Sequence, residues 1–257
     1  MSVAATLPIS PASPITAPSA ATGAYKDLLI RLLSRQLLAE SATLEVFAKA
    51  VDLAPTFNEK VLSARFAYEE GEHTRVVLKV LAELGVDGEP IIADRPSAEE
   101  FWGIRLNSWV ALAAFNFLVD RAGSHQIEEY LHSSYRPWAK HLYRMLGEEA
   151  AHYENGIRNI QDFVDEGTQL DKFQEVIDEL LPVLLKRAFG RVESEENKLA
   201  VQFGLKRSSS DVIANNYLSE ISVPLKQAGL HFPPLAAFDA AGTVIADSTK
   251  EIILSLQ

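Results

Sequence analysis

The chain has 257 residues, 47% hydrophobic and 23% charged, which is enough for one large domain or two small ones with a sizeable core. Its formal net charge of −11 argues against nucleic acid and an anionic membrane as partners, because both attract clustered Lys and Arg. The absence of cysteine excludes disulfides, iron–sulfur clusters and thiolate zinc sites, and it fits a reducing compartment, so we expect a cytoplasmic protein.

The first segment, residues 1–24, is rich in Ala, Ser, Thr and Pro and precedes the first basic residue, Lys26. A secretory signal peptide needs a basic start and an unbroken apolar run, and the prolines interrupt any such run here. The composition therefore predicts a disordered leader. The most apolar later run, residues 109–119, is too short to span a bilayer and is typical of a buried helix.

From residue 25 to about residue 84 the apolar residues follow a helical period. Residues 25–51 place a stripe of leucines and a phenylalanine on one face of a first long helix. Pro55 interrupts this pattern and is well placed to open a second helix, which runs from about residue 57 to residue 84. A polar connector over residues 85–96 follows.

Two more long helices are expected next. Ser97 and Glu100 match a capping box that opens a third helix, which extends to about His132. Pro137 opens a fourth helix that extends to about Val164. Each of the four predicted helices is far longer than the usual three turns, and the loops between them are short enough for antiparallel neighbours.

The remainder of the chain predicts shorter helices over residues 170–187, 193–203 and 208–227, followed by an irregular tail over residues 231–257 that has room for a short strand or hairpin. No strand alternation persists elsewhere. The fold class is therefore all-α: a four-helix bundle with additional C-terminal helices that occupies residues 25–230.

Two of the long helices carry the motif Glu-x-x-His. Glu70 and His73 share a face of the second helix with apolar residues, and Glu149 and His152 do the same on the fourth. Glu148 is expected to face solvent or to support the ligands from outside. A buried carboxylate is costly unless it is paired or bound to a cation, so both motifs indicate a cation in the core.

The other two long helices supply one carboxylate each. Glu40 lies on the apolar stripe of the first helix, 30 residues before Glu70, whereas its neighbour Glu45 is expected to be solvated. Asp120 ends the apolar run of the third helix, 29 residues before Glu149, and Asn116 lies one turn away on the same face. Helices of matching length bring both pairs to the same height in the bundle.

Four-helix bundles that bind two metal ions use this ligand set. We interpret six residues as the metal ligands and the catalytic centre, in preference to solvated or core polar residues: Glu40, Glu70, His73, Asp120, Glu149 and His152. Four carboxylates balance two divalent ions, and mixed oxygen and nitrogen ligation favours iron, or manganese, over copper or a closed zinc site. Two iron ions (Fe²⁺/Fe³⁺) together supply the two electrons that activation of O2 needs.

The residues around these positions resemble the catalytic subunit of the bacterial ring 1,2-phenylacetyl-CoA epoxidase, a family of ferritin-like diiron monooxygenases. The resemblance covers roughly residues 25–247. It is carried by YKDLLIRLLSRQLLAES, EEGEHTRVVLKVLAELG, FLVDRAG and SSYRPWAKHLYRMLGEEAAHYENG, and the Leu-Val-Asp at Asp120 is more specific than the ligands themselves. It implies that Asp120, rather than Asn116, is a ligand.

The resemblance implies an epoxidation in which O2 is the co-substrate and one oxygen atom enters an aromatic acyl-CoA. The chain has no cysteine cluster or dinucleotide-binding motif, so the electrons must come from a separate reductase. It further implies a homologous non-catalytic subunit as partner, with a homodimer as the alternative. This chain retains all six ligands, as the catalytic type does.

Two departures leave the substrate open. The connector between the second and third helices is shorter than in the epoxidase, and a basic cluster for a CoA phosphate is not evident. Arg136, Lys140 and Arg144 are candidates, or else a solvated cationic stripe. His141 is either a substrate-channel residue or a core histidine, and His125 is expected at the surface.

Three competing functions follow from these observations. The first is a ferritin-like diiron oxygenase that hydroxylates or N-oxygenates a small organic substrate without CoA. The second is a metal-free scaffold subunit, which the presence of all six ligands disfavours. The third is an iron-storage ferritin, which needs fewer helices than this chain predicts.

Overall fold

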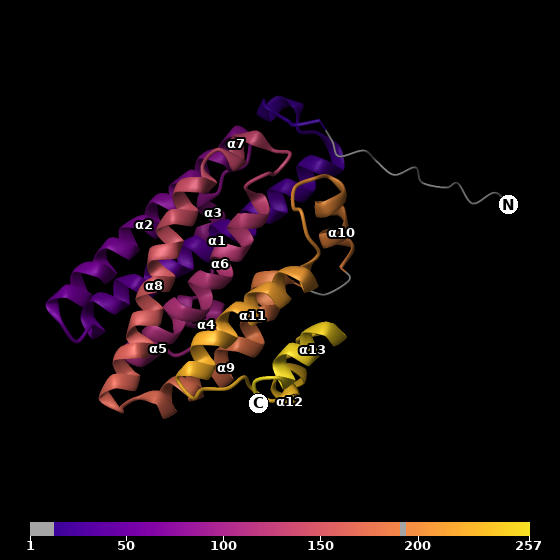
Figure 1. Ribbon diagram of the computed structural model, residues 1–257. Coiled ribbons are helices and arrows are strands. Elements are labelled where there is room, and N and C mark those ends of the chain that lie inside the picture. Colours follow the sequence, from indigo (N-terminus) through magenta and orange to yellow (C-terminus); the bar gives the residue numbers. More distant parts are fainter. Residues whose placement is uncertain (1–12, 191–193) are drawn as a thin grey trace.

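The computed structural model describes residues 13–190 and 194–257 and confirms the all-α class (Figure 1). Within these ranges every named element is helical, and the extended pairing is an isolated bridge between Ile15 and Tyr135. No helix in the described ranges combines the length and the hydropathy needed to cross a bilayer.

The first two predicted helices are observed close to their expected bounds. Helix α1 (Gly23–Leu53) and helix α2 (Phe57–Glu83) form a hairpin in which the two helices pack along much of their length (Figure 1). Thr56 caps α2, because its hydroxyl accepts a hydrogen bond from the Glu59 amide at 3.1 Å. The connector that follows contains one short helix, α3 (Glu89–Ala93).

The prediction of a single third helix is wrong, because the chain leaves helical geometry between residues 103 and 108. Helix α4 (Ala98–Trp102) begins at the predicted Ser97 cap and ends at Gly103, whose φ of 70° is a left-handed conformation. Ser108 then caps a new helix, α5 (Trp109–Phe115), which continues through a π-helical turn, η2 (Asn116–Asp120), into α6 (Arg121–Tyr130).

The fourth predicted helix is also divided. A single turn, α7 (Arg136–Ala139), contains Pro137, and the long helix α8 (Leu142–Glu166) begins only after His141. The amides of the two residues between α7 and α8 donate to carbonyls of α7, so the hydrogen-bond pattern of α7 ends before α8 begins. The last residue of α8 is Glu166, two residues after the expected end at Val164, and Gly167 follows it in a left-handed conformation.

The C-terminal part covers one side of the bundle with five helices: α9 (Leu170–Phe189), α10 (Glu195–Gln202), α11 (Ser210–Gln227), α12 (Leu235–Ala240) and α13 (Asp247–Leu254) (Figure 1). The expectation of an irregular tail after residue 230 is wrong, since α12 and α13 pack on α9 and α11. Phe238 and Ile253 anchor them because both side chains are fully buried.

The N-terminal segment also differs from the prediction of a disordered leader. Of residues 1–24, positions 1–12 lie outside the described ranges. From residue 13 the chain runs beside the turn before α7, where the Ile15 amide donates to the Ser134 carbonyl at 2.7 Å and the Ile15 carbonyl accepts from the Arg136 amide at 2.9 Å. Ala21 is buried just before α1 begins.

The apolar core consists of two clusters, and helices α1, α2 and α8 each contribute to one cluster in one part of their length and to the other cluster further along. On α1, residues up to Leu37 belong to one cluster and residues from Ala42 onward to the other. On α2 the change falls between Phe66 and Val77, and on α8 it falls between Met145 and Tyr153. The predicted ligands occupy this boundary, so a polar layer crosses the bundle between two dry regions.

A glycine on α8 permits the π-helical turn that carries Asp120. A Cβ atom on Gly156 would lie 2.6 Å from the Phe117 amide nitrogen and 2.7 Å from its Cα, which is closer than real Cβ contacts allow. Since the contact is with backbone, the neighbour has no side-chain freedom to relieve it. Helix α8 and η2 therefore approach each other only because residue 156 lacks a side chain.

We predict that Gly156→Ala lowers the free energy of unfolding by about 1–3 kcal/mol, because the methyl group forces η2 away from α8. Gly147→Ala is the matched control on the same helix, since its Cβ would meet nothing within 4 Å. It should raise stability by about 0.5–1 kcal/mol. Urea denaturation of both variants measures this, and equal effects would contradict it.

Candidate metal centre

The structure brings all six predicted ligands together in two overlapping groups. Glu40, Glu70, His73 and Glu149 form one group, and Glu70, Asp120, Glu149 and His152 form the other. Within each group, one nitrogen or oxygen atom from each residue lies within 4.8 Å of the others. Glu70 and Glu149 belong to both groups and therefore lie where a bridging carboxylate would.

Each helix presents its ligand for a local reason. The three-residue spacing of Glu70 and His73 on α2, and of Glu149 and His152 on α8, places each pair on one helix face. Asp120 ends η2, and the wider π turn there turns its side chain toward the core together with that of Asn116. No residue among the six is more than 4% exposed.

Several atoms at the centre have no hydrogen-bond partner among the described residues. These are the Nδ1 atoms of His73 and His152 and both carboxylate oxygens of Glu70. His73 Nδ1 lies 3.4 Å from Glu40 Oε2 and 3.5 Å from Glu149 Oε1, and His152 Nδ1 lies 3.4 Å from Glu70 Oε1. Orphaned buried polar atoms are rare because each is costly, so atoms that converge in this way fit bound cations.

Two further glutamates hold the histidine rings. Glu148 Oε2 lies 2.9 Å from His73 Nε2, and Glu69 Oε2 lies 2.9 Å from His152 Nε2. The support is crossed, because Glu148 on α8 binds the histidine of α2 and Glu69 on α2 binds the histidine of α8. A proton on each Nε2, donated to the carboxylate, leaves Nδ1 as a lone pair that faces the centre.

Sequence reasoning missed Glu69 and left the role of Glu148 open. The signal was present, because both motifs read Glu-Glu-x-x-His and the first glutamate of each doublet is the one that reaches across. Exposed arginines hold these two carboxylates from outside: Arg65 Nε donates to Glu69 at 2.7 Å and Arg144 Nε donates to Glu148 at 2.8 Å.

Amide side chains hold the two carboxylates that come from the other helices. Asn116 donates to Asp120 Oδ2, and Asn155 of α8 in turn donates to Asn116 Oδ1 at 2.8 Å. Gln36 donates to Glu40 from one turn earlier on α1. Asn116 therefore supports Asp120, as its position one turn away suggests.

The metal-free centre retains protons. Burial raises the pKa of Glu70 well above its usual value, and the charges of Glu149 and Glu40 raise it further. Burial likewise raises the pKa of Asp120, despite the opposing effect of His152. Burial alone would lower the pKa of His73, but the carboxylates of Glu149 and Glu40 that face its Nδ1 outweigh burial and raise that pKa. Cations entering the site would displace these protons.

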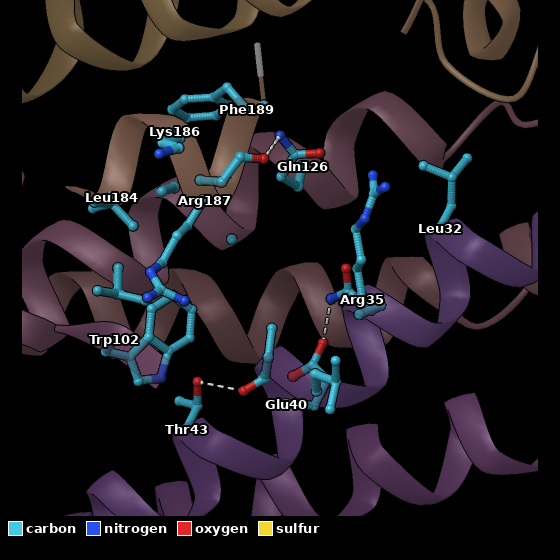
Figure 2. Close-up of a pocket in the computed structure, with 18 of the residues that line it drawn as sticks. Leu32, Arg35, Glu40, Thr43, Trp102, Gln126, Leu184, Lys186, Arg187 and Phe189 are labelled. Atoms are coloured by element: carbon cyan, nitrogen blue, oxygen red, sulfur yellow. Dashed lines mark hydrogen bonds between the residues drawn. The ribbon is translucent and has the colours of Figure 1, made fainter. Parts of the chain in front are cut away.

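A cavity of about 520 Å³ opens onto the centre (Figure 2). Four proposed ligands line it, all of them carboxylates: Glu40, Glu70, Asp120 and Glu149. Its walls come from α1, α4, η2, α6 and α9 and include Trp102, Phe101, Leu184 and Phe189. The cavity thus joins an apolar, aromatic chamber to a set of buried carboxylates.

The basic residues at this cavity are not the ones that the sequence suggests. Arg136, Lys140 and Arg144 do not line it, and Arg144 instead pairs with Glu148. The cations that line it are Arg35, Lys186, Arg187 and Lys206, which come from α1, α9 and the segment after α10.

Three other expectations are resolved by the structure. His141 does not line the cavity. His125 is buried rather than at the surface, and its Nε2 lies 3.1 Å from Glu220 Oε2. Glu45 has a side chain that is 46% exposed, in line with the expectation of a solvated residue; it pairs with Arg95 and accepts a hydrogen bond from the Ala98 amide at 3.2 Å, which fixes the start of α4.

Comparison with known proteins gives one family. A model of the family described as phenylacetic acid catabolic protein matches residues 3–244, which is most of the chain. A comparison with curated proteins finds no match.

We predict that Glu70→Gln stabilises the metal-free protein at alkaline pH. The pKa of Glu70 lies above its unfolded value of 4.5, so the stability tied to its proton is present below that pH and is lost as pH rises through the folded pKa. As the pH rises above 4.5 and through the folded pKa of Glu70, the wild type should lose stability and the variant should lose less, by on the order of 1–3 kcal/mol.

Thermal unfolding in the presence of a chelator measures this, with Glu72→Gln as control because Glu72 makes an ion pair with Arg75 at the surface of α2. Added Fe²⁺ or Mn²⁺ should reverse the order, since the variant lacks a bridging carboxylate. A variant that is less stable than wild type without metal across this pH range would contradict the prediction.

We also predict that Glu69→Ala and Glu148→Ala each weaken metal binding by roughly 10–100-fold, because the histidine that loses its partner is free to rotate or change tautomer. Glu72→Ala should leave the affinity unchanged. Titration of the metal-free protein with Mn²⁺ or Co²⁺ measures the affinities, and wild-type affinity in both variants would show that the crossed carboxylates do not support the ligands.

Proposed function

The chain belongs to the phenylacetic acid catabolic protein family, and on that premise we propose that it is a diiron monooxygenase that inserts one oxygen atom from O2 into an organic substrate. The proposed reaction is epoxidation of an aromatic acyl-CoA such as phenylacetyl-CoA. One observation carries the proposal: two buried groups of four ligands share Glu70 and Glu149 at the end of an apolar cavity.

Two iron ions bound by these residues would supply the electrons and the open coordination positions that activation of O2 needs. Glu40 and His73 would hold one ion, Asp120 and His152 the other, and Glu70 and Glu149 both. The choice of iron over manganese rests on this redox chemistry, because the ligand set itself suits either metal.

The chain's own contribution is to fix ligands and to exclude water. Glu69 and Glu148 lock the orientation of the imidazoles, and Asn116 and Gln36 orient the carboxylates of Asp120 and Glu40. Phe66 closes the side away from the cavity, with its ring centroid 4.2 Å from that of His152. Solvent therefore reaches the ligands through the cavity that the substrate would fill.

The cavity supports an aromatic substrate. Its volume of about 520 Å³ is in the usual range for a small-molecule site, and Trp102, Phe101 and Phe189 supply flat apolar walls. The exposed side chains of Lys186 and Arg187 lie at the same cavity, where a CoA arm would leave it. Figure 2 shows Arg187 above Trp102 and across the open space from Arg35.

The partners follow from what the chain lacks and retains. A separate reductase would deliver the electrons, because the sequence has no cysteine for an iron–sulfur cluster and no dinucleotide-binding motif. The family model does not separate catalytic from non-catalytic members, but all six ligand residues are present and converge, which supports the catalytic type. A homologous non-catalytic subunit, or a second copy of this chain, is the proposed structural partner.

A second candidate is a diiron oxygenase whose substrate carries no CoA, acting by hydroxylation or N-oxygenation. It is favoured by the position of Lys206, a buried cation that lines the cavity. The metal-free scaffold and the storage ferritin gain no support, since the ligands are present and the centre opens onto an aromatic cavity.

We predict that protein produced with iron binds about two iron ions per chain and, once reduced, converts phenylacetyl-CoA to a product that contains one oxygen atom from labelled O2. Mass spectrometry of the product and iron analysis of the protein measure both. Asp120→Ala and Glu149→Ala should lose iron and product together, while the surface variant Glu72→Ala retains both.

The outcomes separate the competing functions. Well-folded protein with an empty or single-ion site would contradict the diiron assignment. Two bound irons with no oxygenated acyl-CoA, but an oxygenated free acid or amine, would select the second candidate.

A further inference from the structure

One cation at the cavity is buried, and the others are not. Lys206 is 7% exposed, whereas Lys186 and Arg187 are exposed and Arg35 pairs with Glu196 through two guanidinium–carboxylate contacts. Lys206 follows α10, in the segment that leads to α11, and it lines the same cavity as the carboxylate ligands. A lysine this deeply buried needs a physical reason.

Burial disfavours the charge of Lys206, and the nearby carboxylates of Glu129 and Glu196 offset this only in part, so its pKa stays lowered. Within the described residues its ammonium makes one hydrogen bond, to Gln126 Oε1 at 3.2 Å, and it forms no ion pair. The ring of Tyr130 lies beside it, 5.4 Å from Nζ to the centroid. The nearby carboxylate of Glu129 instead accepts hydrogen bonds from the backbone amides of Arg207 and Ser208, at 2.9 and 2.6 Å.

Gln126 fixes the position of the ammonium but leaves donors free. Its Nε2 donates to the Ala188 carbonyl at 2.6 Å, so its amide is held between α9 and Lys206. An ammonium has three N–H donors, and Gln126 accepts one of them. The other N–H donors belong to the Lys206 ammonium, and Lys206 lines the cavity. Burial also lowers the pKa of Lys206 to about 8.

The distance to the metal centre follows from helix geometry. Asp120, Gly123 and Gln126 succeed one another at three-residue spacing along η2 and α6, and all three line the cavity. At a rise of about 1.5 Å per residue, Gln126 lies about 9 Å beyond Asp120 along the helix axis. In Figure 2, Gln126 and Glu40 lie on opposite sides of the open space.

We propose that Lys206, positioned by Gln126, binds an oxyanion of the substrate inside the cavity, and that this oxyanion is the carboxylate of a small aromatic acid. A buried ammonium is stabilised by an anion in direct contact, which neither Glu129 nor Glu196 provides within the described residues, and a substrate carboxylate would supply that contact. The substrate's ring would then lie between Lys206 and the carboxylate ligands.

The short span favours a carboxylate over the other source of an oxyanion, a phosphate of a CoA arm. A CoA phosphate is separated from the acyl group by the whole pantetheine chain. That length exceeds a span of about 9 Å, so the phosphates of a bound acyl-CoA would reach the exposed Lys186 and Arg187 instead. The inference rests on the second candidate function, a diiron oxygenase whose substrate carries no CoA, and it takes the carboxylate ligands as the reacting end.

The test compares an anion with its neutral isostere. Isothermal titration calorimetry of the iron-loaded full chain would measure binding of phenylacetate, phenylacetamide and phenylacetyl-CoA. Wild type should bind phenylacetate more tightly than phenylacetamide. Lys206→Met should weaken the binding of phenylacetate by at least about tenfold and change the affinity for phenylacetamide by less than about twofold. Only the anion loses a charged hydrogen bond.

Three further variants keep the test decisive. Lys206→Arg should restore most of the preference for the anion, and Lys186→Met, which removes an exposed lysine of the same cavity, should leave it unchanged. If Lys206→Met does not fold, as judged by thermal unfolding, Lys206→Gln tests the same loss of charge with a polar side chain.

The inference fails if the wild type shows no preference for phenylacetate over phenylacetamide. It also fails if Lys206→Met and Lys206→Gln weaken the binding of acid and amide equally. It also fails if they weaken phenylacetyl-CoA alone, which would assign Lys206 to a phosphate. These outcomes are independent of the reaction, because binding is measured without reductant. Absence of iron or of an oxygenated product would overturn the proposed function and leave the preference for the anion standing.

Discussion

The constraint on which the rest of this structure depends is the burial of four carboxylates within one polar layer of the bundle. Glu40, Glu70, Asp120 and Glu149 are all nearly inaccessible and lie close enough to repel one another. Without a cation the protein must keep protons on some of them, as the raised pKa values of Glu70 and Asp120 show. A fold selected for stability alone would place apolar residues here, because replacing buried charges by well-packed hydrophobic residues often stabilises a protein. The layer is therefore evidence for a function that needs cations.

The surrounding fold limits the consequences of that layer. Two apolar clusters lie above and below it along α1, α2 and α8, so the proposed ligands are confined to the boundary between them. The π-helical turn η2 and Gly156 let the third segment approach α8 closely enough for Asp120 to complete the second group. Local irregularity at this position thus serves the centre, which is where π turns commonly occur.

The sequence alone predicts which six side chains converge better than it predicts the helices that carry them. Spacing and apolar context identify the six residues that converge, because a Glu-x-x-His motif and its partner carboxylate are local features of regular helices. The break at Gly103 and the π turn before Asp120 were not predicted, since a left-handed glycine and a widened turn leave the apolar periodicity almost intact. Lys206 could not be placed at all from its sequence context, because its burial depends on how α10 and α11 fold back onto α6.

The two sides of the centre differ chemically. One side is supported by surrounding protein residues, and the other faces the cavity that a substrate would occupy. His73 and His152 do not line the cavity, and each is held from behind by a glutamate and an exposed arginine on α2 and α8. The cavity side presents only carboxylates, which can change from one coordinating oxygen to two or bridge a pair of ions. Imidazoles have one nitrogen to offer and gain from being fixed. A metal centre of this kind would have to hold its ions firmly and still leave coordination positions open toward a bound molecule. Rigid ligands on the protein side and adaptable ligands on the cavity side would meet both needs. The crossed Glu-Glu-x-x-His motifs produce that arrangement.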